Sequence, residues 1–286
     1  MLARYGASVL LLLPNQQTLT ASVRRKLEHI TCGDRVEFVT DTKDGEVVTS
    51  IATRKNVLQR ADFRNKTKTL ASNIDQIVIV TAIKPEADWQ LVDQLIVAGI
   101  DMDVEILLLA HKSDLENSKE LHQTHHYYQK IGHRSLITSL HEPATLDALH
   151  SHLIGKTNIL VGQSGMGKST LANYLIENSE IKIGALSESS GHGQHTTSVA
   201  QCYPLGENAY LIDSPGVRDF TATQLSANQV SAGFLEIHKA AENCKFNDCR
   251  HQQEPACAVR EQLEQGLISQ DRMASFARLL KQQNSL

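Results

Sequence analysis

The chain has 286 residues, of which 41% are hydrophobic and 21% are charged, and its formal net charge is −4. This length accommodates one large domain or two to three smaller ones, and the hydrophobic fraction is enough for a buried core. No run approaches 18 apolar residues, which excludes a transmembrane helix, and Val9–Leu13 fits a buried strand better than a signal peptide. We therefore expect a soluble protein without a membrane partner.

Charge is distributed unevenly along the chain. Residues 1–70 contain 12 Lys and Arg against 7 Asp and Glu, whereas residues 71–286 contain 16 against 25. A basic N-terminal segment on an acidic protein indicates a surface that faces a polyanion such as nucleic acid. A solvated basic face without any partner explains the same asymmetry nearly as well.

Residues 1–70 predict a small all-β domain followed by a linker. Short apolar runs between turn signals predict strands at Ser8–Leu13, Thr18–Val23, Arg35–Thr40 and Glu46–Ala52. The spacing fits an antiparallel barrel of the OB type. Residues 53–72 are basic and polar without a clear period, which predicts a linker.

Residues 71–222 alternate between predicted strands and predicted helices, which indicates a mostly parallel α/β sheet. Near-continuous apolar runs predict strands buried on both faces at Ile77–Ala82, Val104–Ala110, Ser135–Thr138, Asn158–Val161, Val199–Tyr203 and Ala209–Ile212. The intervening helices are predicted at Glu86–Ala98, Thr145–Leu153 and Lys168–Glu177. Residues 223–286 predict a helical domain, including a helix at Ala227–Ala241.

A phosphate-loop pattern, G-x-x-x-x-G-K-[ST], lies between a predicted strand and a predicted helix. Its glycines let backbone N–H groups surround a polyphosphate, and the following helix N-terminus adds a favourable dipole. Lys168 is expected to reach the β- and γ-phosphates, and the Ser169 hydroxyl to bind Mg²⁺. The residues expected to contact the nucleotide here are Gly162, Gln163, Ser164, Gly165, Met166, Gly167, Lys168, Ser169 and Thr170.

A D-x-x-G pattern, Asp213 to Gly216, follows the phosphate loop. The Asp213 carboxylate ends an apolar strand, where it can approach Mg²⁺ through water, and Gly216 can offer its N–H to the γ-phosphate. The pattern also occurs in plain turns, so its distance from the phosphate loop gives it its weight.

A guanine-reading box, N-K-x-D in form, is matched by His111, Lys112, Ser113 and Asp114, but it precedes the phosphate loop. Ordinary GTPases have the reverse order, so the sequence predicts a circularly permuted GTPase. The aspartate of such a box accepts hydrogen bonds from guanine that adenine cannot supply. His111 replaces the usual Asn, which leaves open an NTPase with relaxed base selectivity. Ser139, after the next strand, is a weaker candidate for a backbone contact with the base.

Residues 187–199 form a polar, glycine-containing segment where a switch belongs. Thr196 or Thr197 could complete the Mg²⁺ shell, and His195 could orient the attacking water. Gln194 is a rival for that role. Without further information, an exposed loop histidine explains His195 more readily.

Three cysteines and one histidine, Cys244, Cys249, His251 and Cys257, fall within fourteen residues. Zn²⁺ favours a closed tetrahedral shell of sulfur and nitrogen, and Cys₃His is a recognised structural composition. Five cysteines with one tight cluster argue against a secreted disulfide framework, so we expect a structural zinc site in a reducing, cytoplasmic compartment.

These segments together resemble the circularly permuted GTPases that assist maturation of the small ribosomal subunit, the RsgA or YjeQ family. The resemblance rests on residues 162–170, on Gly193-Gln194-His195-Thr196-Thr197 and on the Cys/His spacing. In that family the histidine that matches His195 is taken to be catalytic. The departures are His111 for Asn, Gln194 for Arg, Ser214 for Thr and a short N-terminus, which suggest a diverged member or second copy.

The resemblance implies a late-stage assembly factor that binds GTP or GDP with Mg²⁺, docks on the small (30S) subunit and contacts 16S rRNA. An OB face and basic segment are expected to meet the rRNA phosphates, through Arg24, Arg25, Lys26, Arg54, Lys55, Arg60, Arg64, Lys66 and Lys68. We expect a monomer. The alternative of another class is a nucleotide-gated RNA-binding module with negligible catalysis.

Overall fold

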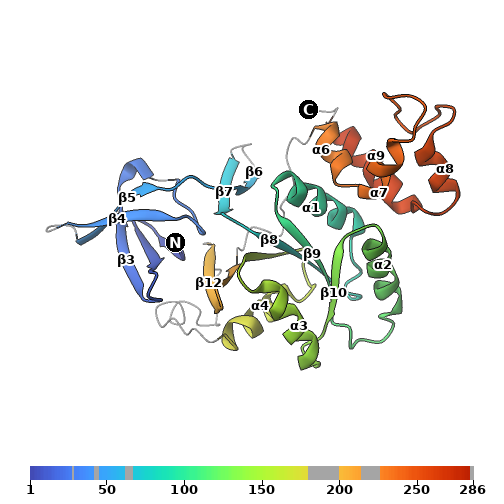
Figure 1. Cartoon of the computed structure of the whole chain (residues 1–286). Helices are drawn as coiled ribbons and strands as arrows, with labels where there is room; N and C mark the ends of the chain where they lie inside the picture. Colours follow the sequence, from blue (N-terminus) through green and yellow to red (C-terminus); the bar gives the residue numbers. More distant parts are fainter. Residues whose placement is uncertain (28, 42–44, 62–66, 180–199, 214–225, 284–286) are drawn as a thin grey trace.

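The computed structural model describes residues 1–27, 29–41, 45–61, 67–179, 200–213 and 226–283. Figure 1 shows a blue N-terminal sheet and orange-red C-terminal helices at opposite ends of the molecule, with an α/β domain between them. No helix in these described ranges combines the length and apolar character needed to cross a membrane.

The N-terminal sheet has five strands in the order β1-β2-β3-β5-β4, and only the β3–β5 pair is parallel. Its strands are β1 (Ala3–Tyr5), β2 (Ser8–Leu12), β3 (Thr18–Val23), β4 (Val36–Asp41) and β5 (Gly45–Ile51). Strand β2 is apolar from Val9 to Leu12, and its central residues are buried on both sides of the sheet. Val9 and Leu11 join the core of this sheet, whereas Leu10 joins the core shared with the α/β domain.

The predicted linker is wrong in part, because residues 57–72 contain an antiparallel ribbon of β6 (Val57–Ala61) and β7 (Thr67–Ser72). The ribbon is fixed where Leu58 and Leu70 enter the main core. The same region is tied to the N-terminal sheet by the fully buried Asp34 carboxylate, which accepts hydrogen bonds from Arg54 Nε at 2.7 Å and Ser72 Oγ at 2.7 Å. Local composition alone does not show these long-range contacts.

The central sheet has six strands in the order β10-β9-β8-β11-β13-β12, all parallel except β12, as the alternation predicted. They are β8 (Gln76–Thr81), β9 (Glu105–His111), β10 (Arg134–Thr138), β11 (Thr157–Val161), β12 (Gln201–Gly206) and β13 (Ala209–Asp213). Ile77 and Ile79 of β8 pack on one side of the sheet, and Val78 and Val80 on the other. Burial on both faces explains the unbroken apolar runs.

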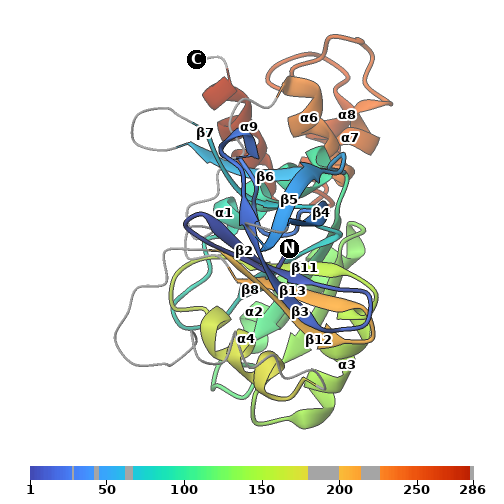
Figure 2. The same ribbon diagram turned by 90° about the vertical axis from the view of Figure 1, so that its left-hand side faces the viewer.

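Helices cover both faces of this sheet (Figures 1 and 2). They are α1 (Trp89–Asp101), α2 (Lys119–Lys130), α3 (Pro143–Leu153) and α4 (Lys168–Glu177). Helix α1 begins three residues later than predicted, because the Asp88 side chain caps it by accepting the N–H groups of Gln90 and Leu91.

The C-terminal helices are α6 (Ala227–Ala232), α7 (Leu235–Ala241), α8 (Ala258–Glu264) and α9 (Gln270–Gln283). The single helix predicted at Ala227–Ala241 is therefore wrong, because the chain turns at Gly233 and Phe234. A Cβ at Gly233 would lie 2.3 Å from the Val97 side chain of α1, and Phe234 is fully buried. Packing against α1 decides this break.

Candidate nucleotide and zinc sites

The phosphate loop connects β11 to α4 at the carboxyl edge of the central sheet. The chain places β9 and β10 on one side of β8, and β11 and β13 on the other, so the strand order reverses beside the loop. Open α/β sheets bind ligands beyond the carboxyl ends of their strands at such a point. Gly162 lies close to β8. Its φ is 128°, and a Cβ at this position would lie 2.4 Å from the Val80 carbonyl oxygen. Only a glycine at this position lets the loop backbone pass this close to β8.

Lys168 lies at the start of α4, and its ammonium group bonds to the loop itself. Its Nζ donates to the carbonyl oxygens of Gly162 at 2.6 Å and Gln163 at 2.5 Å. Ser164, Ser169 and Thr170 are exposed, whereas Met166 is buried beneath the loop. The loop therefore combines an apolar anchor with polar groups that remain accessible to a ligand.

The guanine-reading box, residues 111–114, forms a loop at the end of β9, the base loop, which contacts the phosphate loop directly. Lys112 Nζ donates to the carbonyl oxygen of Gly165 at 2.7 Å and to that of Lys84 at 3.1 Å. A Cβ at Gly167 would lie 2.8 Å from His111 Cδ2 and 3.3 Å from Lys112 Cε. Two segments that are far apart in sequence thus form one site.

His111 is buried, and its Nδ1 lies 3.1 Å from Thr138 Oγ1 of β10. Burial lowers the pKa of His111 below its usual value, with Lys112 adding to the effect. The ring is consequently neutral at pH 7. It fills the space between β10 and Gly167 of the phosphate loop.

Asp114 retains an accessible carboxylate that is held by Ser139. The Ser139 hydroxyl donates to Asp114 Oδ1, and this bond is the main reason that the pKa of Asp114 is lowered. Ser113 donates its N–H to the Thr138 carbonyl oxygen at 3.2 Å. The Ser139 side chain thus orients Asp114, and the backbone contact from Ser139 to a base stays a prediction.

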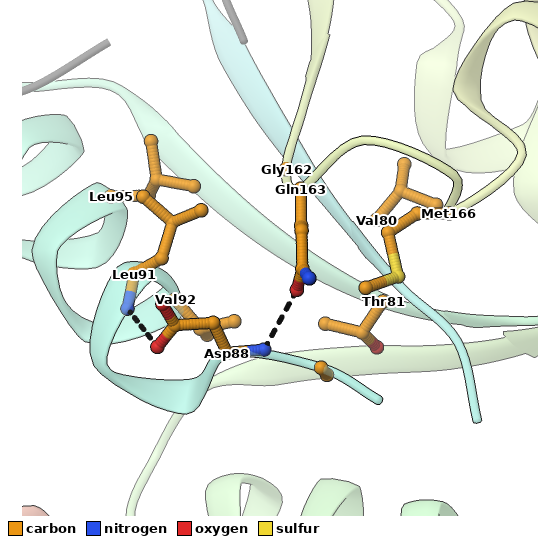
Figure 3. A pocket seen from close by; sticks show the side chains of 10 residues that line it. Val80, Thr81, Asp88, Leu91, Val92, Leu95, Gly162, Gln163 and Met166 are labelled. Carbon is orange, nitrogen blue, oxygen red and sulfur yellow. Dashed lines mark hydrogen bonds between the residues drawn. The ribbon is translucent and has the colours of Figure 1, made fainter. Parts of the chain in front are cut away.

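Thr138 and Asp88 are site neighbours that the sequence analysis missed. Thr138 is the last residue of the strand predicted at Ser135–Thr138. Its position at the end of a strand beside the base loop is the signal from which the sequence could have indicated it. The Asp88 N–H donates to Gln163 Oε1 at 3.0 Å, which joins α1 to the phosphate loop (Figure 3). Only the tertiary structure reveals this second contact.

Asp213 ends β13 at the same carboxyl edge, one strand away from the phosphate loop, and is exposed. The remaining predicted residues of the nucleotide site lie outside the described residues; they are Gln194, His195, Thr196, Thr197 and Gly216.

The four predicted zinc ligands, Cys244, Cys249, His251 and Cys257, come together with their ligand atoms all within 4.8 Å of one another. His251 Nδ1 lies 3.6 Å from Cys244 Sγ and 3.5 Å from Cys257 Sγ, and these two sulfur atoms are 3.9 Å apart. A tetrahedral zinc ion spaces sulfur pairs by about 3.8 Å and sulfur–nitrogen pairs by about 3.5 Å. The donor set therefore fits one zinc ion.

Comparison with known proteins places the chain in a family. The sequence model of the RsgA GTPase matches residues 51–223. A small ribosomal subunit biogenesis GTPase RsgA from Azotobacter vinelandii is 38% identical, over 92% of this chain and 78% of the relative. The protein of the same name from Photorhabdus laumondii is 36% identical over 98% of this chain and 83% of the relative. The chain belongs to the RsgA GTPase family.

Solved structures agree with this family fold. YjeQ from Thermotoga maritima superposes with a TM-score of 0.77 at 23% identity, covering 100% of this chain and 97% of that one. YloQ, a circularly permuted GTPase, gives 0.74 at 22% identity, covering 99% and 94%. The permuted fold predicted from motif order is thereby confirmed for this RsgA-family chain.

Proposed function

We propose that this chain hydrolyses GTP to GDP and phosphate, and acts as a late-stage assembly factor of the small ribosomal subunit. The observation that carries the chemistry is the contact between Lys112 and Gly165, which joins a base loop to a phosphate loop at one sheet edge. The relatives named small ribosomal subunit biogenesis GTPase support the biological role.

Each residue of the nucleotide site receives a role in this proposal. The phosphate-loop residues 162–170 hold the phosphates, with Lys168 neutralising their charge. Asp114 reads guanine N1–H and N2–H, with His111, Lys112 and Ser113 completing the base loop. Ser169 with Thr196 or Thr197 would hold Mg²⁺, which neutralises charge on the phosphates when bound. Asp213 would approach the metal through water, and Gly216 would donate its N–H to the γ-phosphate. His195 would orient the attacking water.

The N-terminal unit, residues 1–70, is proposed as an OB fold that binds 16S rRNA. The parallel β3–β5 pair within an otherwise antiparallel sheet supports this assignment, as does the basic composition. Residues 71–222 form the GTPase domain and residues 223–286 the zinc-binding helical domain, in which zinc is structural. We expect a cytoplasmic monomer.

The function is tested by GTP hydrolysis with and without purified small ribosomal subunits. Strong stimulation by the subunits is expected, because the proposal makes them the partner. GTP binding without stimulation would refute the assembly role and favour a nucleotide-gated RNA-binding module. Competition between GTP and ATP in the same preparation tests guanine selection by Asp114.

His195 is tested separately, by steady-state turnover and nucleotide affinity of His195→Ala. A group that orients water acts on the chemical step, so we expect turnover to fall about 100-fold while GTP affinity stays nearly unchanged. Gln194→Ala is measured alongside it, because Gln194 is the rival for the same role. Turnover that survives in His195→Ala and falls in Gln194→Ala would move the role to Gln194.

A further inference from the structure

A buried ion cluster joins the GTPase domain to the C-terminal helices. Arg272 of α9 lies 2.5 Å from Asp93 of α1 and 2.6 Å from Glu236 of α7, measured between nitrogen and carboxylate oxygen. The three side chains are 3%, 2% and 8% exposed, respectively. The cluster is therefore sealed from water at the junction of the two units.

Neighbouring aromatic rings hold the Arg272 guanidinium in one place. It lies 4.1 Å from the ring centre of Phe234 and 5.3 Å from that of Tyr128. The Tyr128 hydroxyl also donates to Asp93 at 2.5 Å. A buried charge without its partner is strongly destabilising, so these groups can separate only at a large cost. The C-terminal unit thus fixes one side of α1, whose other side packs on the central sheet.

The other side of the same helix contacts the phosphate loop. Figure 3 shows Leu91, Val92 and Leu95 of α1 facing Met166 across a small pocket, beside the Asp88–Gln163 hydrogen bond. Asp93 follows Asp88 by five residues, a rise of about 7.5 Å in a helix. The ion cluster and the phosphate loop therefore hold the same two turns of α1.

A stacked ring adds rigidity between these two contacts. Trp89, at the start of α1, stacks on Tyr128 with ring centres 5.3 Å apart and planes 25° from parallel. Tyr128 is the residue that bonds to Asp93. A displacement of Arg272 would thus be transmitted to the helix turn that carries Asp88.

We infer that Arg272 is a positioning residue for nucleotide binding, which acts through Asp93 and α1 on Gln163 and Met166 of the phosphate loop. This inference rests on the proposed nucleotide site. Because coupling between two sites is reciprocal, nucleotide binding also stabilises the docked position of the C-terminal unit. No group of the C-terminal unit needs to touch the nucleotide.

The test is the dissociation constant of a fluorescent GDP analogue, measured with Mg²⁺ on the full chain. Arg272→Lys keeps a positive charge but loses the paired contacts of the guanidinium, so binding is expected to weaken about fivefold. Arg278→Lys, an exposed position on the same helix, is the matched control and is expected to match the wild type.

Two further variants separate positioning from simple loss of stability. Val259→Ala removes buried volume from α8 in the C-terminal core without touching Arg272, so GDP affinity is expected to stay within about twofold of the wild type. In a Gln163→Ala background, the effect of Arg272→Lys is expected to shrink, because the contact that transmits it is weakened. Equal weakening by Val259→Ala, or an undiminished effect with Gln163→Ala, would overturn the inference.

The outcomes distinguish this inference from the proposed function. A wild-type chain that binds no guanine nucleotide would end both proposals. Wild-type binding with no change in Arg272→Lys would overturn the inference alone. If Arg272→Lys does not fold, Asp93→Asn tests the same contact, and unchanged GDP affinity in that variant gives the same negative answer.

Discussion

The proposed nucleotide site and the proposed zinc site are built in opposite ways. The contact between Lys112 and Gly165 joins residues 53 positions apart, and the sheet brings them together. The predicted zinc ligands Cys244 and Cys257 are only 13 positions apart and lie in turns between α7 and α8. The first site is positioned by the large core of the central sheet, whereas the second lies on the smaller core of the C-terminal helices, which Cys257 joins.

This difference shows where each site obtains its rigidity. Strands β8, β9 and β11 are almost completely buried, so the loops at their ends inherit a fixed spacing. Three of the described C-terminal helices, α6, α7 and α8, have only six or seven residues, and the buried side chains of this unit form one cluster that is smaller than either cluster of the central sheet. A small core stabilises a domain weakly, and such domains use metals to compensate. We therefore expect a zinc ion at this cluster to support the fold of the C-terminal unit.

Zinc removal should have the largest effect, and the effect should be confined to the C-terminal unit. Cys257→Ser, or treatment with a chelator, is expected to cost the C-terminal unit several kcal/mol, because ligand binding there is coupled to folding. Hydrogen exchange should accelerate in α7, α8 and α9 while β8 and β11 stay protected. Cys202→Ser alters a cysteine outside the cluster and is the control. Unchanged melting of a metal-free preparation would show that zinc is not structural.

Lys168→Ala tests the sheet-built site and should have the next largest effect. The variant lacks the ammonium group and its charge-assisted bonds to phosphate, each worth about 1.5–3 kcal/mol, so GDP should bind about 100-fold more weakly. The fold should survive, because Lys168 lies at the surface end of α4. Isothermal titration with GDP measures the affinity, and unchanged affinity would remove the phosphate-loop assignment.

His111→Asn should have the smallest effect. It restores the asparagine that is usual at the first position of the guanine-reading box, and so tests what His111 does there. The amide restores the usual donor toward guanine N7, so GDP affinity should rise about threefold, equivalent to one added neutral hydrogen bond. Thermal stability should fall slightly, because Asn fills less of the space between Thr138 and Gly167. A fall in affinity would mean that the imidazole itself holds the base loop in place. Titration and a melting curve on the same preparation give both values.

The sequence was enough to predict what each of the two sites binds. The phosphate-loop spacing, the early position of Lys112 and Asp114, and the Cys/His cluster each depend on residues close together in the chain. Local patterns of this kind carry chemistry directly, since a glycine, a lysine or a thiolate is required at a fixed spacing. They were enough to predict a permuted GTPase fold and a zinc-type ligand set.

How the N-terminal sheet, the central domain and the C-terminal helices are joined could be seen only in the tertiary structure. The sequence predicts a linker where β6 and β7 form a ribbon, because the contacts that fix the ribbon are distant in sequence. Leu58 enters the main core, and Ser72 bonds to Asp34 of the N-terminal unit. The break at Gly233 depends on Val97, and the Arg272 cluster unites α1, α7 and α9. Such contacts leave no periodic signal, because burial and ion pairing between remote segments are set by how the whole chain packs.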